Sequence, residues 1–262
     1  MAGDIQLSRD GAIATVTIDH EARRNAMSQH MWRRLGAVFG EISDDGDLRC
    51  VILRGAGETA FCAGADISEF EKVRGTAAAS REYENAVRPG LAAVAACPHP
   101  VIARIHGPCI GGGLELAACA DMRIAGASAT FAVPSARLGL VLSFHDLYRV
   151  AQLIGPSNLK EVLFEVATMD TAHALRIGLV NRVVPDAEVA DNVAATAARI
   201  ARLAPLTHRW HKQAIDTLSA CGHPGDVPDE AHDSAHEVFD SEDFREGCRA
   251  FMEKRKPVFK GR

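Results

Sequence analysis

Short apolar runs alternate with long stretches of helical pattern, and this alternation is what most constrains the fold. Residues 12–18 alternate weakly in polarity, whereas residues 50–53 and 101–105 are continuous apolar runs that suit buried strands. Between them, Ser28 stands where an N-cap would precede a helix. Residues 76–96 are rich in alanine and carry apolar side chains at helical spacing. The alternation predicts an α/β protein.

The pattern changes near residue 186, after which the sequence is almost continuously helical. Pro205 and the stretch 221–225 interrupt this helical pattern. No repeat at a fixed period and no long polar linker divides the chain, so we expect closely packed lobes rather than independent domains. We therefore predict a core at residues 1–185 and a helical lobe at residues 186–262.

The composition disfavours several classes of partner. The chain has 262 residues, of which 47% are hydrophobic and 24% charged, enough for one large core or two unequal lobes. Its formal net charge of −5 disfavours nucleic acid and membrane surfaces, because both are polyanionic. No run approaches the roughly 20 apolar residues of a membrane span, and the N-terminus lacks the layout of a signal peptide. We expect a cytoplasmic protein without nucleic-acid or membrane partners.

The cysteines give no sign of a disulfide framework or a metal centre. Seven of them are scattered along the chain, and none forms a C-x-x-C pair. An odd, scattered set of this kind is typical of reduced thiols that are mostly buried. We therefore expect no metal site.

Two segments rich in small residues follow two of the apolar runs, and both are candidates for ligand binding. Residues 60–67 (AFCAGADI) come after the run at 50–53, and small side chains there let the backbone approach a ligand closely. Residues 107–115 (GPCIGGGLE) come after the run at 101–105 and open onto a helical pattern. A helix N-terminus presents unpaired N–H groups, so glycines there can bring backbone donors against a developing oxyanion.

Each feature of the second segment also has a simpler interpretation. A triple glycine is commonly a tight strand-to-helix junction, and here it lacks both the Gly-Lys-Ser/Thr of a phosphate loop and the dinucleotide-binding spacing. Glu115 lies three residues after Gly112, so it would share a helix face with the turn. A glutamate in a first helical turn is usually a capping or dipole residue. Neither feature alone predicts a function.

Taken together, the segments resemble the crotonase family, also called the enoyl-CoA hydratase/isomerase family. The resemblance runs through nearly the whole chain: RRNAM near the start, FCAGADI, HGPCIGGGLELA, ADMRIA, and FMEKRKPVF near the end. As a combination these motifs are highly specific. The resemblance implies a crotonase-like superhelix of repeated ββα turns, followed by C-terminal helices that build a homotrimer, with two trimers often stacked into a hexamer.

The resemblance also implies the site. The oxygen of an acyl-CoA thioester would accept hydrogen bonds from the backbone N–H groups of Ala65 and Gly112, and Glu115 would be a catalytic glutamate. Lys254 would reach the CoA phosphates of a neighbouring subunit. No cofactor is implied, since CoA is part of the substrate. The other residues implied in substrate binding are Arg24, Ala26, Ala63, Asp66, Ile67, Ser68, Gly111, Ser135 and Leu142.

The chain departs from the family pattern where a second glutamate is expected. A typical hydratase has two glutamates that hold one water between them, and the second follows the first by twenty residues, where this chain has Ser135. A serine hydroxyl has no useful acid–base pKa near neutrality, so it does not substitute in kind.

The glycine-rich segment that opens the next helix in typical members is also replaced, here by residues 142–146 (LSFHD). The bulky Leu142 and Phe144 suggest a changed acyl pocket. His145 or Asp146 could supply a different proton carrier. The alternatives are a cap for the following helix, made by Ser143 or Asp146, and a surface position for His145.

Several activities stay open for a chain with one retained glutamate. A weak hydratase could use Glu115 alone, and an isomerase could move a proton with one base. A decarboxylase related to methylmalonyl-CoA decarboxylase would need the oxyanion hole and a carboxylate pocket, although Ala65 stands where such members carry a histidine. A non-catalytic acyl-CoA-binding protein is the remaining alternative, and retention of Glu115 argues against it.

Overall fold

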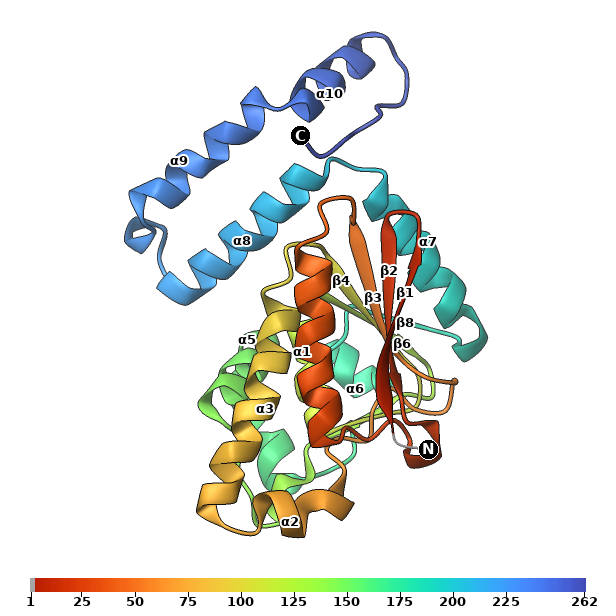
Figure 1. Ribbon diagram of the computed structural model, residues 1–262, viewed down its shortest axis with the longest axis vertical. Coiled ribbons are helices and arrows are strands. Elements are labelled where there is room, and N and C mark those ends of the chain that lie inside the picture. The colour runs from red at the N-terminus through yellow and green to blue at the C-terminus, as the bar shows by residue number, and fades with distance from the viewer. Residues whose placement is uncertain (1–2) are drawn as a thin grey trace.

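The computed structural model describes residues 3–262 and shows a layered α/β body from which the last helices project (Figure 1). This confirms the predicted α/β class. The strands are β1 (Asp4–Asp10), β2 (Ile13–Asp19), β3 (Cys50–Gly55), β4 (Val101–Ile105), β5 (Pro108–Ile110), β6 (Met122–Gly126), β7 (Thr130–Ala132) and β8 (Arg182–Val184). The α-helices are α1 (Gln29–Ser43), α2 (Phe70–Arg74), α3 (Ala77–Ala95), α4 (Gly112–Cys119), α5 (Phe144–Glu165), α6 (Thr171–Arg176), α7 (Val189–Ala201), α8 (Pro205–Cys221), α9 (Asp229–Glu237) and α10 (Glu242–Met252).

The strands form one large sheet and one short ladder beside it. The six-stranded sheet has the order β1-β2-β3-β4-β6-β8, with β1 and β2 antiparallel and every later pair parallel. The short ladder pairs β5 with β7 and is continued by single bridges, including Met27 with Ala65 and Cys62 with Cys109. Because each crossover passes from the large sheet through the short ladder to a helix, the chain winds as the predicted superhelix of ββα turns.

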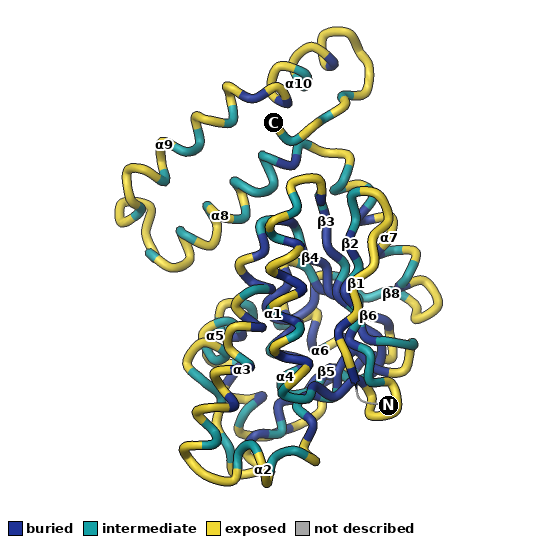
Figure 2. Tube along the Cα trace, viewed as in Figure 1, coloured by how far each residue is buried: buried dark blue, intermediate teal, exposed yellow. Residues whose placement is uncertain are grey.

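Both faces of the large sheet are buried, which explains why the run at 50–53 is apolar at every position. Val51 and Leu53 belong to the main core, which also contains buried side chains of α1 and α3. Cys50 packs in a second cluster together with Val189 and other residues of α7. Figure 2 shows this buried interior running through the sheet, with exposed residues on the outer sides of the helices.

The helix predicted after Ser28 and the helical pattern at residues 76–96 are confirmed as α1 and α3. Ser28 is the N-cap of α1, and its side chain accepts a hydrogen bond from the Met31 N–H at 3.3 Å. Thr76 caps α3 in the same way through the Ala79 N–H at 3.2 Å. Both caps satisfy one of the N–H groups left unpaired in a first helical turn.

The helices after residue 186 lie in two different surroundings. Helix α7 contacts β2, β3, β4 and β6, so it belongs to the body of the molecule. The projecting part is formed by α8, α9 and α10 (Figure 1). Pro205 is the first residue of α8, and Gly222 ends that helix in the left-handed conformation at φ 81°. The helical pattern therefore continues through two different environments, which its periodicity alone does not distinguish.

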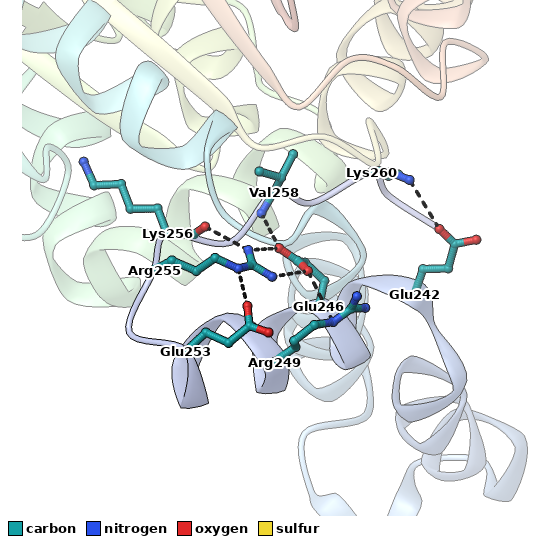
Figure 3. A network of polar contacts seen from close by, with 8 residues as sticks. All are labelled: Glu242, Glu246, Arg249, Glu253, Arg255, Lys256, Val258 and Lys260. Atoms are coloured by element: carbon teal, nitrogen blue, oxygen red, sulfur yellow. Dashed lines mark hydrogen bonds and ion pairs between the residues drawn. The ribbon is translucent and has the colours of Figure 1, made fainter.

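The chain after α10 folds back along that helix (Figure 3). Glu246 accepts hydrogen bonds from the Arg255 guanidinium at 2.6 and 2.9 Å and from the Val258 N–H at 3.0 Å. The buried carboxylate of Asp243 accepts the N–H groups of Lys260 at 2.6 Å and Gly261 at 2.8 Å. Two carboxylates of α10 thus hold the C-terminal tail in place.

Among residues 3–262, no helix is long and apolar enough to cross a membrane. Several large apolar side chains are nevertheless exposed on the projecting helices, among them Phe239, Phe251 and Met252. Phe251 is 83% exposed, which is unusual for an aromatic side chain at the end of a stable helix. The projecting helices thus present apolar surface to their surroundings.

Candidate active site

A cavity of about 240 Å³ lies where the two small-residue segments meet. Its walls come from residues 63–74, from α3, from the start of α4 and from residues 133–146. These segments are far apart in the sequence, and the ββα winding brings them together. Most of the lining is apolar, with charged side chains at a few positions, as is typical of pockets for small organic ligands.

The amides of Ala65 and Gly112 lie next to each other at one wall of this cavity. A Cβ atom placed on Gly112 would lie 3.7 Å from the Ala65 nitrogen, and one placed on Gly64 would lie 3.5 Å from the Gly112 nitrogen. Gly64 and Gly111 have φ of 96° and 52°, a left-handed conformation that glycine adopts without strain. Neither the Ala65 N–H nor the Gly112 N–H donates to another residue in the part of the chain that the structure describes. Two unpaired backbone N–H groups therefore belong to neighbouring residues of the cavity wall.

Gly112 is also the first residue of α4, and its N-cap Gly111 has no side chain with which to cap the helix. The N–H groups of the first turn and the positive end of the helix dipole are therefore available to a ligand. Glu115 lies one turn further along α4 and lines the same cavity. Glu115 thus lies on the same side of α4 as the N–H groups of Ala65 and Gly112 (the amide pair), as its three-residue spacing from Gly112 predicts.

Glu115 is strongly affected by its surroundings. It keeps some surface open to the cavity, but protein atoms replace most of the water around its carboxyl group. Burial, and after it the negative charge of Asp146, raise the pKa of Glu115 to about 8, although the Arg74 guanidinium opposes the shift. Glu115 is thus mostly protonated near neutral pH, which is a suitable state for a proton donor.

Asp146 enters the cavity from the start of α5. Its carboxylate accepts a hydrogen bond from the Ser143 hydroxyl at 2.6 Å, and the Asp146 N–H donates to the Ser143 oxygen at 3.3 Å. Ser143 is therefore the N-cap of α5, and Asp146 takes part in the cap while also facing Glu115. His145 is exposed and is not among the residues that line the cavity. Phe144 does not line it either and is 88% exposed.

The residues implied in substrate binding fall into two groups. Those that line the cavity are Ala63, Ala65, Ile67, Gly111, Gly112, Ser135 and Leu142. Ser135, at the sequence position where the family resemblance leads us to expect a second glutamate, is buried at the cavity wall.

The other group lies outside the cavity. Asp66 binds the Arg23 guanidinium at 2.7 and 2.9 Å and accepts from the Ser68 hydroxyl at 2.7 Å, so this cluster supports the turn beside Ala65. Arg24 is exposed on the neighbouring turn, and Ala26 is buried beneath it. Lys254 lies two residues after the end of α10, and α10 and α2 lie at opposite ends of the molecule (Figure 1).

Several cavity residues were not identified from the sequence. Trp32 comes from α1 and Arg74 from the end of α2, and neither lies in a motif. On α3, the positions of Ser80, Tyr83 and Val87 follow helical spacing, which indicates a shared face but not what that face meets. The Trp32 indole N–H donates to the Tyr83 hydroxyl at 3.2 Å, which joins α1 to α3 behind the amide pair.

Comparisons with known proteins all lead to the same family. Residues 8–262 match the family model "Enoyl-CoA hydratase/isomerase". The chain is 34% identical over 253 residues to the short-chain-enoyl-CoA hydratase of Clostridium acetobutylicum, covering 97% of this chain and 96% of that protein. It is also 34% identical over 271 residues to the carnitinyl-CoA dehydratase of Escherichia coli, covering 100% of both chains.

Solved structures show the same fold. The crystal structure of an enoyl-CoA hydratase/carnithine racemase from Magnetospirillum magneticum superposes with a TM-score of 0.96 at 45% sequence identity, covering 100% of this chain and 97% of that one. The fold and cavity define an enzyme of the crotonase type. The chain belongs to the enoyl-CoA hydratase/isomerase family.

Proposed function

We propose that the cavity binds the thioester of an acyl-CoA and that Ala65 and Gly112 form its oxyanion hole. The observation that carries this proposal is the pair of adjacent, unpaired backbone N–H groups at the cavity wall beside Glu115. Two such donors stabilise the negative charge that develops on the thioester oxygen, and removal of one donor in a comparable site costs on the order of 3 kcal/mol. No cofactor is required, because the CoA moiety is part of the substrate.

The reaction that the charged groups support best is the addition of water to a 2-enoyl-CoA. Asp146 accepts a proton from the water, the water oxygen bonds to C3, and the protonated Glu115 delivers its proton to C2. Glu115 takes the acid role because its pKa is raised to about 8, while Asp146 faces it as the charged partner. In this proposal Asp146 replaces the glutamate that is missing at Ser135.

The test compares three substrates on the purified protein: crotonyl-CoA, a 3-enoyl-CoA and methylmalonyl-CoA. We expect hydration of crotonyl-CoA, detected as loss of the conjugated enoyl absorbance and formation of 3-hydroxybutyryl-CoA. Turnover of the 3-enoyl-CoA alone would instead establish an isomerase, and release of CO₂ from methylmalonyl-CoA a decarboxylase.

The oxyanion hole is tested separately with two ligands that do not react. Butyryl-CoA has the thioester carbonyl, whereas S-butyl-CoA is its matched thioether without that oxygen. We expect calorimetry to give tighter binding of butyryl-CoA by about tenfold or more, since a hydrogen bond contributes roughly 0.5–1.5 kcal/mol and two donors are present. Equal affinities would contradict an oxyanion hole, and no heat with either ligand would contradict acyl-CoA binding.

We further propose that the chain assembles at least as a trimer through α8, α9 and α10. These helices project from the body and expose apolar side chains, among them Phe251 and Met252, which an interface would bury. Assembly would also give Lys254 access to the CoA bound by a neighbouring copy. Sedimentation equilibrium is expected to give three or six times the mass of one chain, and a monomer would contradict the proposal.

A further inference from the structure

Arg74 places a positive charge at the cavity, and no acidic side chain among residues 3–262 pairs with it. It ends α2 and lines the cavity, with its guanidinium carbon 5.1 Å from the centre of the Phe70 ring and 4.8 Å from that of Tyr83. Within residues 3–262, Arg74 makes neither an ion pair nor a hydrogen bond. The two rings hold the guanidinium in place by cation–π contact while its N–H groups stay available.

A second donor lies beside this guanidinium. The Tyr83 oxygen accepts the Trp32 indole N–H at 3.2 Å, so its own proton is free to be donated, and that proton has no acceptor among residues 3–262. Burial raises the pKa of Tyr83 to about 12, which keeps the hydroxyl protonated at physiological pH. Arg74 and Tyr83 thus offer donors from one charged and one neutral group, a pairing suited to a carboxylate.

The indole of Trp32 sets how far these donors lie from the reacting carbonyl. Its Cζ2 atom would be 3.2 Å from a Cβ on Gly112, next to the amide pair, while its Nε1 atom binds Tyr83. Nε1 and Cζ2 are both bonded to the same ring carbon, Cε2, so the Tyr83 hydroxyl lies close to the start of α4. We expect an acyl chain of a few carbons to suit this short separation.

Acidic side chains also line the cavity, and their charges must be compared with the positive charge of Arg74. Glu115 is mostly protonated near neutral pH, and Asp146 accepts a hydrogen bond from Ser143 at the start of α5. Glu84 lines the cavity from α3, but its side chain is exposed and forms no ion pair with Arg74. A cationic acyl group would find the faces of Phe70 and Tyr83 already occupied by the guanidinium, so the aromatic side chains do not form an open cage for a cation.

We propose that the enzyme prefers an acyl-CoA whose short chain ends in a carboxylate, which Arg74 binds as an ion pair and Tyr83 binds through its hydroxyl. The substrate class is thus a CoA thioester of an unsaturated dicarboxylic acid. This inference rests on the proposed function, because it assumes that the thioester lies at Ala65 and Gly112.

The first experiment needs no variant. It compares turnover of glutaconyl-CoA, a 2-enoyl-CoA with a terminal carboxylate, with turnover of 5-methylhex-2-enoyl-CoA, in which an uncharged isopropyl group replaces the carboxylate. Hydrogen bonds to a charged group contribute roughly 1.5–3 kcal/mol, so we expect kcat/KM to favour glutaconyl-CoA by about 10- to 100-fold. A ratio of one or below overturns the inference. A preference for a trimethylammonium-substituted crotonyl-CoA over both would overturn it as well.

Variants of cavity residues then show which side chains recognise the carboxylate. Arg74→Gln is expected to remove most of the preference for glutaconyl-CoA, and Tyr83→Phe to reduce it by a smaller factor, with the preference read in each variant as the ratio of the two kcat/KM values. The matched control is Arg81→Gln, which removes the same charge from an exposed position on α3 outside the cavity. If Arg81→Gln changes the ratio as much as Arg74→Gln, general electrostatics rather than a binding site explains the preference.

Calorimetry gives a readout that is independent of turnover. Glutaryl-CoA and 5-methylhexanoyl-CoA are saturated counterparts of the two substrates, and we expect glutaryl-CoA to bind more tightly to the wild type but not to Arg74→Gln. If neither binds, the proposed function fails. If both bind with equal affinity, the function stands and only this inference fails. Should Arg74→Gln not fold, the wild-type affinity ratio still decides the question.

Discussion

Glu115 in the cavity and Glu246 on α10 are the same residue type in opposite surroundings. Burial and the charge of Asp146 raise the pKa of Glu115 to about 8. The Arg255 guanidinium and the Val258 N–H lower the pKa of Glu246 to about 2 (Figure 3). One carboxyl group is kept protonated by lack of water and a like charge, and the other is kept ionised by hydrogen-bond donors.

The difference shows what each region can do. A carboxyl group with a pKa near neutrality exchanges protons readily, so Glu115 is suited to proton transfer. An ionised carboxylate that accepts several hydrogen bonds does not take up a proton in the physiological pH range, so Glu246 is suited to holding the C-terminal tail. The strongest test of this comparison is therefore to neutralise each glutamate in turn and measure both activity and structure.

The largest effect is expected from Glu115→Gln. Glutamine keeps the shape of the side chain but cannot deliver a proton, so hydratase activity should fall by roughly 10²–10⁴-fold. Acyl-CoA affinity should change little, because the proposed oxyanion donors are backbone groups. Steady-state kinetics and calorimetry check the two parts. Unchanged turnover would show that another residue carries the chemistry.

Asp146→Asn is expected to have the next largest effect, a loss of roughly 10²-fold in hydration, because the proposed acceptor of the water proton is removed. The matched control is Ser143→Ala, which removes the helix cap but leaves the carboxylate. That control should lower the free energy of unfolding by about 1 kcal/mol and retain most of the activity. Equal losses of activity in both variants would indicate that Asp146 serves only the cap.

A smaller effect concerns stability as a function of pH. The pKa of Glu115 is raised on folding above its ordinary value of 4.5, so the folded state binds the proton more tightly than the unfolded state. Stability that depends on this proton is fully present below pH 4.5 and is lost progressively as the pH rises to about 8. Glu115→Gln should lose less stability than the wild type over that range in denaturant titrations, and identical pH profiles would contradict the raised pKa.

The smallest effect is expected from Glu246→Gln. Losing the ion pair with Arg255 should speed hydrogen exchange at the Val258 amide while leaving the kinetics of the cavity unchanged. In the wild type, the contribution of Glu246 is present above pH 4.5 and lost as the pH falls towards 2, since its pKa is lowered on folding. Glu237→Gln on α9 is the control, because Glu237 is exposed and has no ion pair among residues 3–262. Equal exchange in both variants would show that the tail is held by other contacts.

Local sequence determined the elements and the segments that line the amide pair. The strands at 50–53 and 101–105, the cap at Ser28 and the glycines at Gly111 and Gly112 follow from side-chain size, periodicity and backbone freedom, all properties of neighbouring residues. The resemblance to the family then identified which of these segments meet, and the fold agrees. Contacts between residues a few positions apart can be predicted from the sequence, because the backbone itself brings those residues together.

Tertiary structure decided what surrounds the amide pair. His145 and Asp146 were equal candidates in the sequence, and only the angle at which α5 enters the body places Asp146 at the cavity and His145 outside it. Arg74 and Tyr83 belong to no motif, and they became neighbours of the site because α2 and α3 pack over Trp32. The raised pKa of Glu115 likewise depends on burial by segments far away in the chain. The charge, the water exclusion and the shape of the pocket each depend on many residues that are distant in the sequence, so no local sequence pattern predicts them.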